Sequence, residues 1–102
     1  MRYRVSHAAE RDLLEIFVYW AERVSLSVAD RIIDRITARF RLLGEHPRAG
    51  KSAENVASGV RCFPAGKYLV YYRRTRNMVE ILHIFHSAKD RPALKTKSKP
   101  EL

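Results

Sequence analysis

Histidine and cationic residues in the second half of the chain have the side-chain types that metal-independent RNA cleavage requires. Such cleavage needs a base for the 2′-hydroxyl, an acid for the leaving 5′-oxygen, and cations that offset charge building on the phosphorane. An imidazole suits proton transfer near neutral pH, which makes His86 the candidate acid or base. The candidate phosphate partners are Arg61, Lys67 and Arg73.

The spacing of the histidines in the stretch VEILHIFHSAKD limits this chemistry. His83 and His86 are three residues apart, and side chains alternate along a strand, so the two are expected to point to opposite faces unless a bulge intervenes. Each also has a structural interpretation, His86 as a strand-end residue hydrogen-bonded into the sheet and His83 as a packed or edge residue. No Cys and His cluster has zinc-ligand spacing, and the single Cys62 cannot form an internal disulfide.

Length and charge restrict the class of protein. A chain of 102 residues with 46% hydrophobic residues can form one core without disulfides or metal, and we expect a single domain over residues 1–90 followed by a basic tail, 91–102. Residues 1–50 contain nine basic and seven acidic residues, whereas residues 51–102 contain eleven and four. The resulting positive field attracts polyanions or an acidic protein partner. Without an apolar signal-peptide core or a membrane-length run, a cytoplasmic location is expected.

The first half of the chain predicts one strand and two helices. Residues 3–6 alternate as in a short strand, and Ser6 is a good helix N-cap. The second helix is expected to begin at SVAD with Ser27 as its cap and to end at Gly44 as a left-handed C-cap. The short ERVSL connection predicts an antiparallel helix hairpin. Apolar residues at helical spacing define the buried faces: Leu13, Ile16, Phe17, Trp20 and Val24, then Ala29, Ile32, Ile33, Ile36, Phe40 and Leu43.

The second half predicts a loop and three strands. Residues 45–59 lack periodicity and read as a long ordered loop, a feature that usually has a functional reason. Three runs rich in Val, Ile, Tyr and Phe follow, with short separators that favour antiparallel pairing: VRCFP, KYLVYYRR and VEILHIFHS. The predicted fold is α+β: an N-terminal strand and a helix hairpin packed on a small, mostly antiparallel sheet, in the order β-α-α-β-β-β.

Alternation along KYLVYYRR divides its tyrosines between two faces. Tyr68 and Tyr72 share one face with Val70, and Tyr71 lies on the other beside Arg73. One set is expected in the core. The other would be available for stacking on bases or on a peptide.

Four stretches in this order resemble the ParE branch of the RelE/ParE superfamily, the toxin halves of bacterial type II toxin–antitoxin pairs. They are SHAAERDLLEIFVYWAE, LLGEHPRAG, GVRCFPAGKYLVYYR and VEILHIFHSAKD, and with the first strand they span residues 3–90. The resemblance implies a cytoplasmic toxin that is neutralised by a cognate antitoxin whose C-terminal segment wraps around it. ParE-like members poison DNA gyrase, whereas RelE-like relatives cut messenger RNA at the ribosome. ParE-like sequences similarly carry a histidine where His86 stands and lack the basic and tyrosine array of the RNA-cutting relatives.

Candidate binding residues follow from charge, aromaticity and this resemblance. Arg61 has two open interpretations, a structural ion pair or a contact to a carboxylate or phosphate. Trp20 is either core or anchor, and the arginines spaced by four on the second helix are either a solvated ridge on its outer side or a docking site for an acidic antitoxin. The expected antitoxin-binding residues are Tyr19, Trp20, Arg31, Arg35, Arg39 and Arg61, and the expected target-binding residues are Arg73, Arg74, Arg76 and Lys89.

Three functions remain open, in order of preference. The first is a non-enzymatic ParE-like toxin that inhibits DNA gyrase by binding and is silenced by an acidic, ParD-like antitoxin, with no catalytic residue, metal or cofactor. The second is a RelE-like, ribosome-dependent mRNA endonuclease that uses Arg61, Lys67, Arg73 and His86. The third is a small basic module that contacts nucleic acid directly.

Overall fold

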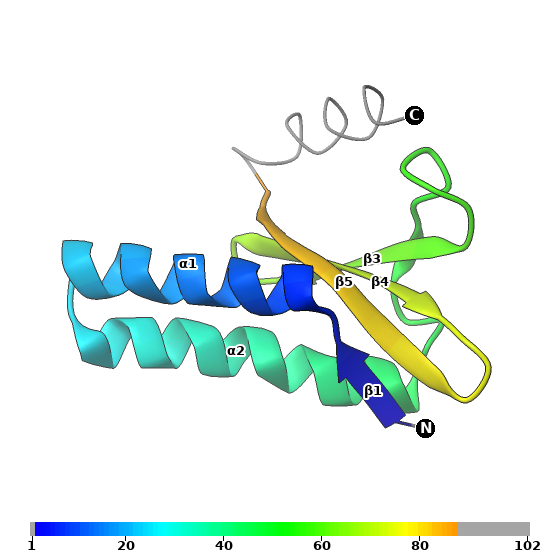
Figure 1. The fold of residues 1–102 in the computed structure, drawn as a ribbon, viewed down its shortest axis with the longest axis horizontal. Coiled ribbons are helices and arrows are strands. Elements are labelled where there is room, and N and C mark those ends of the chain that lie inside the picture. The colour runs from blue at the N-terminus through cyan, green and yellow to red at the C-terminus, as the bar shows by residue number, and fades with distance from the viewer. Residues whose placement is uncertain (1, 88–102) are drawn as a thin grey trace.

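The computed structural model describes residues 2–87, so that Lys89 and the tail 91–102 lie outside the described residues. Two antiparallel helices lie against one face of a five-stranded sheet (Figure 1). The elements are β1 (Arg2–Val5), α1 (His7–Arg23), α2 (Leu26–Glu45), β2 (Lys51–Ser52), β3 (Val60–Ala65), β4 (Tyr68–Arg74) and β5 (Met78–His86). The predicted α+β class and element order are confirmed, with the two-residue β2 as an addition inside the predicted loop.

The sheet has the strand order β1-β5-β4-β3-β2. β1 runs parallel to β5, because the helix hairpin returns the chain across the sheet, and the other pairs are antiparallel. β1 pairs only with the first part of β5, from Met78 to Ile81. The second part of β5 therefore has no strand on that side and lies beside α1.

Serine side chains cap both helices. The Ala9 N–H donates to Ser6 Oγ at 3.0 Å, which confirms the predicted cap of α1. For α2, the prediction of Ser27 is wrong: Ser25 has the extended backbone of an N-cap, and the Val28 N–H donates to its Oγ at 3.1 Å. Gly44 is also not a left-handed cap, since it is buried inside α2 and the helix continues to Glu45.

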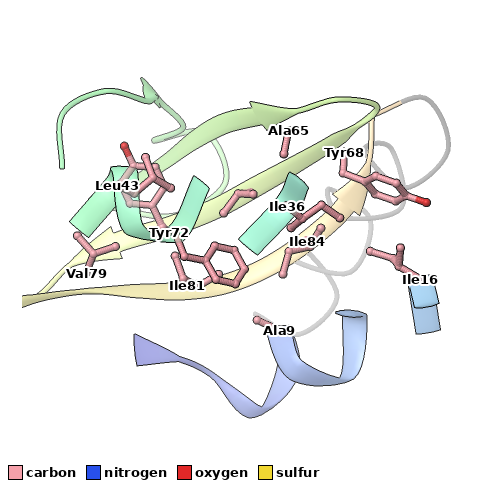
Figure 2. Close-up of a cluster of buried hydrophobic side chains, with 12 residues drawn as sticks. Ala9, Ile16, Ile36, Leu43, Ala65, Tyr68, Tyr72, Val79, Ile81 and Ile84 are labelled. Carbon is pink, nitrogen blue, oxygen red and sulfur yellow. The ribbon is translucent and has the colours of Figure 1, made fainter. Parts of the chain in front are cut away.

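The main core fills the space between the helices and the sheet (Figure 2). Its sheet side includes the buried side chains of Tyr68 and Tyr72, and its helix side includes those of Ile36 and Leu43. Burial of these apolar surfaces is the main force that holds the hairpin on the sheet.

A second, smaller core lies on the opposite face of the sheet. It contains Ala53, Val60, Tyr71 and Phe85, with Val56 packed against them. The expectation that one tyrosine set stays open for stacking is wrong, because Tyr71 is only 6% exposed. The loop between β2 and β3 supplies residues that cover this face, so both faces of β4 are buried.

Candidate functional site

A cleft of about 460 Å³ lies between α1 and the adjoining ends of β4 and β5. Its apolar lining includes Ile16, Tyr68 and Ile84. Trp20 also lines the cleft, and its indole Nε1–H donates to the Tyr68 hydroxyl at 2.8 Å. The His86 ring lies edge-on to Tyr68 with 5.3 Å between centroids. The cleft thus combines apolar and aromatic side chains with polar groups, as ligand- and peptide-binding clefts do.

Charges of opposite sign line the two sides of this cleft. Asp12 and Glu15 stand on α1, and Lys67 and His86 stand on the strand side. Asp12 is already engaged, since its Oδ2 accepts the Ile84 N–H at 2.9 Å. The cleft thus offers an ammonium group and an imidazole to an acidic partner.

The rim of the cleft carries an exposed aromatic group. Tyr19 is 37% exposed, lies edge-on to Trp20 at 5.2 Å, and has the Arg23 guanidinium 4.4 Å above its ring. Trp20 itself is half-buried and packs against the main core. Trp20 is thus both a residue that packs on the core and a residue that lines the cleft, so its two interpretations are compatible.

The two histidines of β5 lie on opposite faces of the sheet, as predicted. A bulge interrupts the pairing near Leu82, but it precedes both histidines: His83 is opposite Tyr71 and His86 is opposite Tyr68. His83 Nδ1 lies 3.0 Å from Asp12 Oδ2, and the His83 ring lies 4.9 Å from Phe85. Asp12 thus ties α1 to the edge of β5 through both a backbone and a side-chain contact, and His83 has a structural partner.

The structure places the four residues of the nuclease alternative in three locations. Lys67 and His86 share the cleft. Arg61 is paired with Tyr72, four positions along the strand from the Tyr68–His86 pair, which is roughly 13 Å at strand spacing.

Arg73 lies elsewhere again, with its Nη2 3.3 Å from Glu80. Tyr71 and Arg73 occupy the face opposite the main core, whereas Arg61 contacts groups on the helix-facing side. Cleavage of one phosphodiester requires these groups to surround the same phosphate. This structure does not bring them together.

Arg4, Glu80 and Arg73 form an ion-pair row across three strands. Glu80 accepts from Arg4 at 2.8 Å and from Arg73 at 3.3 Å, and its side chain is only 15% exposed. Burial opposes ionisation of Glu80, yet the hydrogen bonds and charges of Arg4 and Arg73 outweigh burial and hold its pKa below the ordinary value. Arg73, an expected target-binding residue, is thus partly neutralised by Glu80.

The lowered pKa predicts a pH-dependent contribution of Glu80 to stability. A carboxylate with a depressed pKa stabilises the fold above its unfolded pKa, about 4.3 for glutamate, and this contribution is lost as pH falls through the folded pKa. We expect Glu80→Gln to lower the free energy of unfolding by about 1 kcal/mol at pH 7, because both arginines are half-exposed or more. Urea titrations at pH 7 and at about pH 3 should show this difference shrinking in acid.

Glu10→Gln is the matched control. Its carboxylate lies 3.7 Å from His7 with both groups exposed, so its removal should change stability by less than about 0.5 kcal/mol. A Glu80→Gln penalty that is equal at both pH values would contradict the assignment of the ion pair.

Tyr72 and Arg61 fasten the loop between α2 and β2 to the sheet. The Tyr72 hydroxyl donates to Pro47 O and accepts the Gly50 N–H, both at 2.8 Å, and Arg61 Nη1 donates to Gly50 O at 2.6 Å. Burial raises the pKa of Tyr72, outweighing the Gly50 N–H and the Arg61 charge, which lower it. The hydroxyl therefore stays protonated and able to donate. Arg61 bonds to a carbonyl oxygen, so neither the predicted ion pair nor an open guanidinium describes it fully.

Two arginines of α2, Arg35 and Arg39, lie beside the β3–β4 turn. Arg39 Nε donates to Pro64 O at 3.3 Å, and the Arg35 side chain passes 3.4 Å from the position of a Cβ at Gly66. This arrangement follows from the packing of α2 across β3, which brings one flank of the helix against the strand turn. Arg31 is exposed.

The expected target-binding residues Arg74 and Arg76 are exposed at the far end of β4. Across residues 2–87, no helix is long and apolar enough to cross a membrane. No group of three or more His, Cys, Asp or Glu side chains in the same range is placed to hold a metal ion.

Comparisons with known proteins agree on one family. The model of the family described as the ParE toxin of the type II toxin–antitoxin system parDE matches residues 3–91. Toxin ParE1 of Caulobacter vibrioides is 31% identical over 86 residues, which are 84% of this chain and 88% of that protein. A solved structure of the chromosomal ParDE TA system from P. aeruginosa is similar in fold, with a TM-score of 0.75 at 20% identity over 84% of this chain and 95% of the matched chain.

Proposed function

Because the chain belongs to the family of ParE toxins of type II toxin–antitoxin systems, we propose that it inhibits DNA gyrase by binding in the cytoplasm and that a cognate antitoxin neutralises it. The observation that favours action by binding over RNA cleavage is the distance between the residues of the nuclease alternative. Arg61 fastens a loop and Arg73 is paired with Glu80, so neither cation stands beside His86. A phosphate held at the cleft would meet Lys67 and His86 without the two arginines.

The RelE-like endonuclease remains the alternative because Lys67 and His86 do share one cleft. The imidazole is one group able to transfer a proton, and the ammonium group is one cation. Cleavage requires a base, an acid and cations that stabilise the developing charge, so these two groups do not complete the set. The proposal and the alternative predict different effects on toxicity when the imidazole of His86 is removed.

We expect His86→Ala to leave growth inhibition intact, since a toxin that acts by binding needs no proton transfer at this position. The variant is produced from a repressible promoter in cells without antitoxin, and growth, supercoiling by purified gyrase and cleavage of ribosome-bound message are compared with wild type. Because His86 packs on Tyr68, a circular-dichroism melt accompanies the assay. His7→Ala is the control, since that imidazole is exposed at the start of α1.

Message that is cut at defined codons by the wild type, and no longer cut by His86→Ala at unchanged folded content, would establish the nuclease alternative. Inhibition of gyrase by both proteins would support the proposal.

For the antitoxin we propose docking at the cleft between α1 and β5. An acidic, amphipathic segment would place apolar side chains against Ile16, Trp20 and Ile84 and carboxylates near Lys67. Tyr19 at the rim adds exposed aromatic area, and aromatic residues of this kind dominate the energetics of many interfaces. The flank of α2 that carries Arg31 and Arg35 is a second basic surface for the same partner.

A further inference from the structure

Four arginines gather at the end of the molecule opposite the helix-hairpin turn. Arg2 is paired with Met78, Arg74 with Val79, and Arg76 lies in the turn between these strands. Arg48 lies across a hollow of about 320 Å³ from Arg74. The N-terminus, the end of α2 and the β4–β5 turn lie at this same end (Figure 1).

The positive charge at this end is not compensated by the described part of the chain. None of the four arginines forms an ion pair within residues 2–87, where the acid of β5, Glu80, already bonds to Arg4 and Arg73. One carboxylate, that of Glu45, lines the hollow together with the imidazole of His46. Unpaired guanidinium groups around a concavity produce a positive potential that attracts an anion.

The backbone that carries Arg48 is held in place before any ligand arrives. Pro47 O accepts from the Tyr72 hydroxyl, and the Gly50 amide and carbonyl bond to Tyr72 and Arg61. Residues 47–50 are thus fixed at both ends by buried or half-buried groups from β3 and β4. A fixed loop loses less conformational entropy when its arginine binds a ligand, which favours binding.

We propose that this arginine end binds the phosphate backbone of a nucleic acid and that the hollow between Arg48 and Arg74 seats one phosphate. Several guanidinium groups are spread over one end of the molecule, so a ligand with a row of phosphates matches them better than a ligand with a single carboxylate. Each guanidinium group can bond two phosphate oxygens. The hollow is lined by Arg48, Arg74, His46, Pro47, Ala49 and Glu45. The imidazole of His46 is the one aromatic ring among these six, whereas proteins that bind single strands offer aromatic side chains to successive bases. The surface therefore suits the backbone of a duplex. This proposed binding of nucleic acid goes beyond the proposed inhibition of gyrase and does not depend on that inhibition.

Fluorescence anisotropy with a labelled DNA duplex of about 20 base pairs, titrated at several salt concentrations, tests this proposal. We expect the double variant Arg48→Ala/Arg74→Ala to bind at least about 10-fold more weakly at low salt. The slope of log affinity against log salt should fall in magnitude by about 1, because the one phosphate that the hollow seats is no longer neutralised. Duplex RNA and single-stranded DNA of equal length are run alongside.

The control removes the same two charges elsewhere, through Arg11→Ala/Arg23→Ala on α1. Its affinity should fall less than 3-fold, since a distant charge contributes only through the screened field. Equal losses in the two double variants would overturn the proposal, as would tighter binding of the single strand than of either duplex. Preference for duplex RNA over duplex DNA would support the site and assign RNA as the source of the phosphates.

A variant with an expected gain of affinity tests the hollow through a result that misfolding does not produce. Glu45→Gln removes the one carboxylate that lines the hollow and should tighten duplex binding about 2- to 5-fold, since a like charge no longer opposes the phosphate. An unchanged or weaker affinity for this variant would count against the hollow as the phosphate seat.

Discussion

Gly50→Ala is expected to lower the free energy of unfolding by about 3 kcal/mol, combining overpacking with loss of buried hydrogen bonds. A Cβ at this position would lie 2.6 Å from the Tyr72 hydroxyl oxygen and 2.8 Å from the backbone oxygen of Cys62. Neither neighbour can move freely, because Tyr72 is fully buried and Cys62 belongs to β3. Relief of the clash would break the bonds that hold the loop. Urea unfolding monitored by circular dichroism measures the change.

Gly59→Ala separates this clash from the general effect of a glycine substitution. Gly59 has a φ of 77° but nothing within 4 Å of the Cβ position, so alanine there should cost about 1 kcal/mol through backbone strain alone. Equal destabilisation by the two variants would show that the contacts around Gly50 are not the cause.

Tyr72→Phe completes a double-mutant cycle with Gly50→Ala. Removing the hydroxyl alone should cost about 2 kcal/mol, since Pro47 O and the Gly50 N–H lose a partner in a buried site. Part of the clash disappears in the double variant, so its penalty should be smaller than the sum of the single penalties. Strict additivity would mean that the hydroxyl and Gly50 do not interact.

Local patterns predicted the elements well because their signals are confined to neighbouring residues. The Ser6 cap, the apolar stripe of α2 and the β-rich runs each depend on residues within one or two turns or one strand. The cap of α2 is less well determined by residue type, since serine is a good cap and stands at both position 25 and position 27. In the structure Ser25 has the extended backbone of an N-cap.

Features that depend on distant segments were not predictable in this way. Tyr71 is buried by Ala53 and Val56 from a loop that carries no periodic signal. The Tyr72 bonds span 22 and 25 residues in sequence, and no spacing rule connects a loop proline with a strand tyrosine. Pro47 and Gly50 are residue types that favour loops, but residue type does not show which groups fix the loop.

For the candidate sites as well, residue types were predictable from the sequence, whereas the arrangement of these residues in space was not. The sequence identifies Tyr19, Trp20 and the arginines as residues able to bind, but a cleft requires α1 to cross the ends of β4 and β5. Only the structure shows that Lys67 and His86 face Trp20 across this space. Likewise, only the register shows that Glu80 neutralises Arg73 while Arg74 remains exposed.

Trp20→Ala is expected to weaken binding of the cognate antitoxin about 100-fold, which corresponds to about 2.7 kcal/mol and to the loss of a central aromatic anchor. The indole both lines the cleft and donates its Nε1–H to the Tyr68 hydroxyl. Truncation therefore removes contact area and also the hydrogen bond to Tyr68. Isothermal titration of purified toxin with antitoxin measures the affinity, and rescue of growth by co-produced antitoxin reports it in cells.

Two further variants separate anchoring from a general loss of packing. Trp20→Phe keeps an aromatic ring but not the Nε1–H donor, and we expect it to lose about 10-fold in affinity, between wild type and alanine. Leu14→Ala removes an exposed apolar side chain, 63% accessible, that does not line the cleft, and should leave the affinity within about 2-fold because it lies outside the proposed interface. If Leu14→Ala weakened the complex as much as Trp20→Ala, the antitoxin would have to cover a different face of α1. Unchanged affinity in Trp20→Ala at full folded content would exclude the cleft altogether.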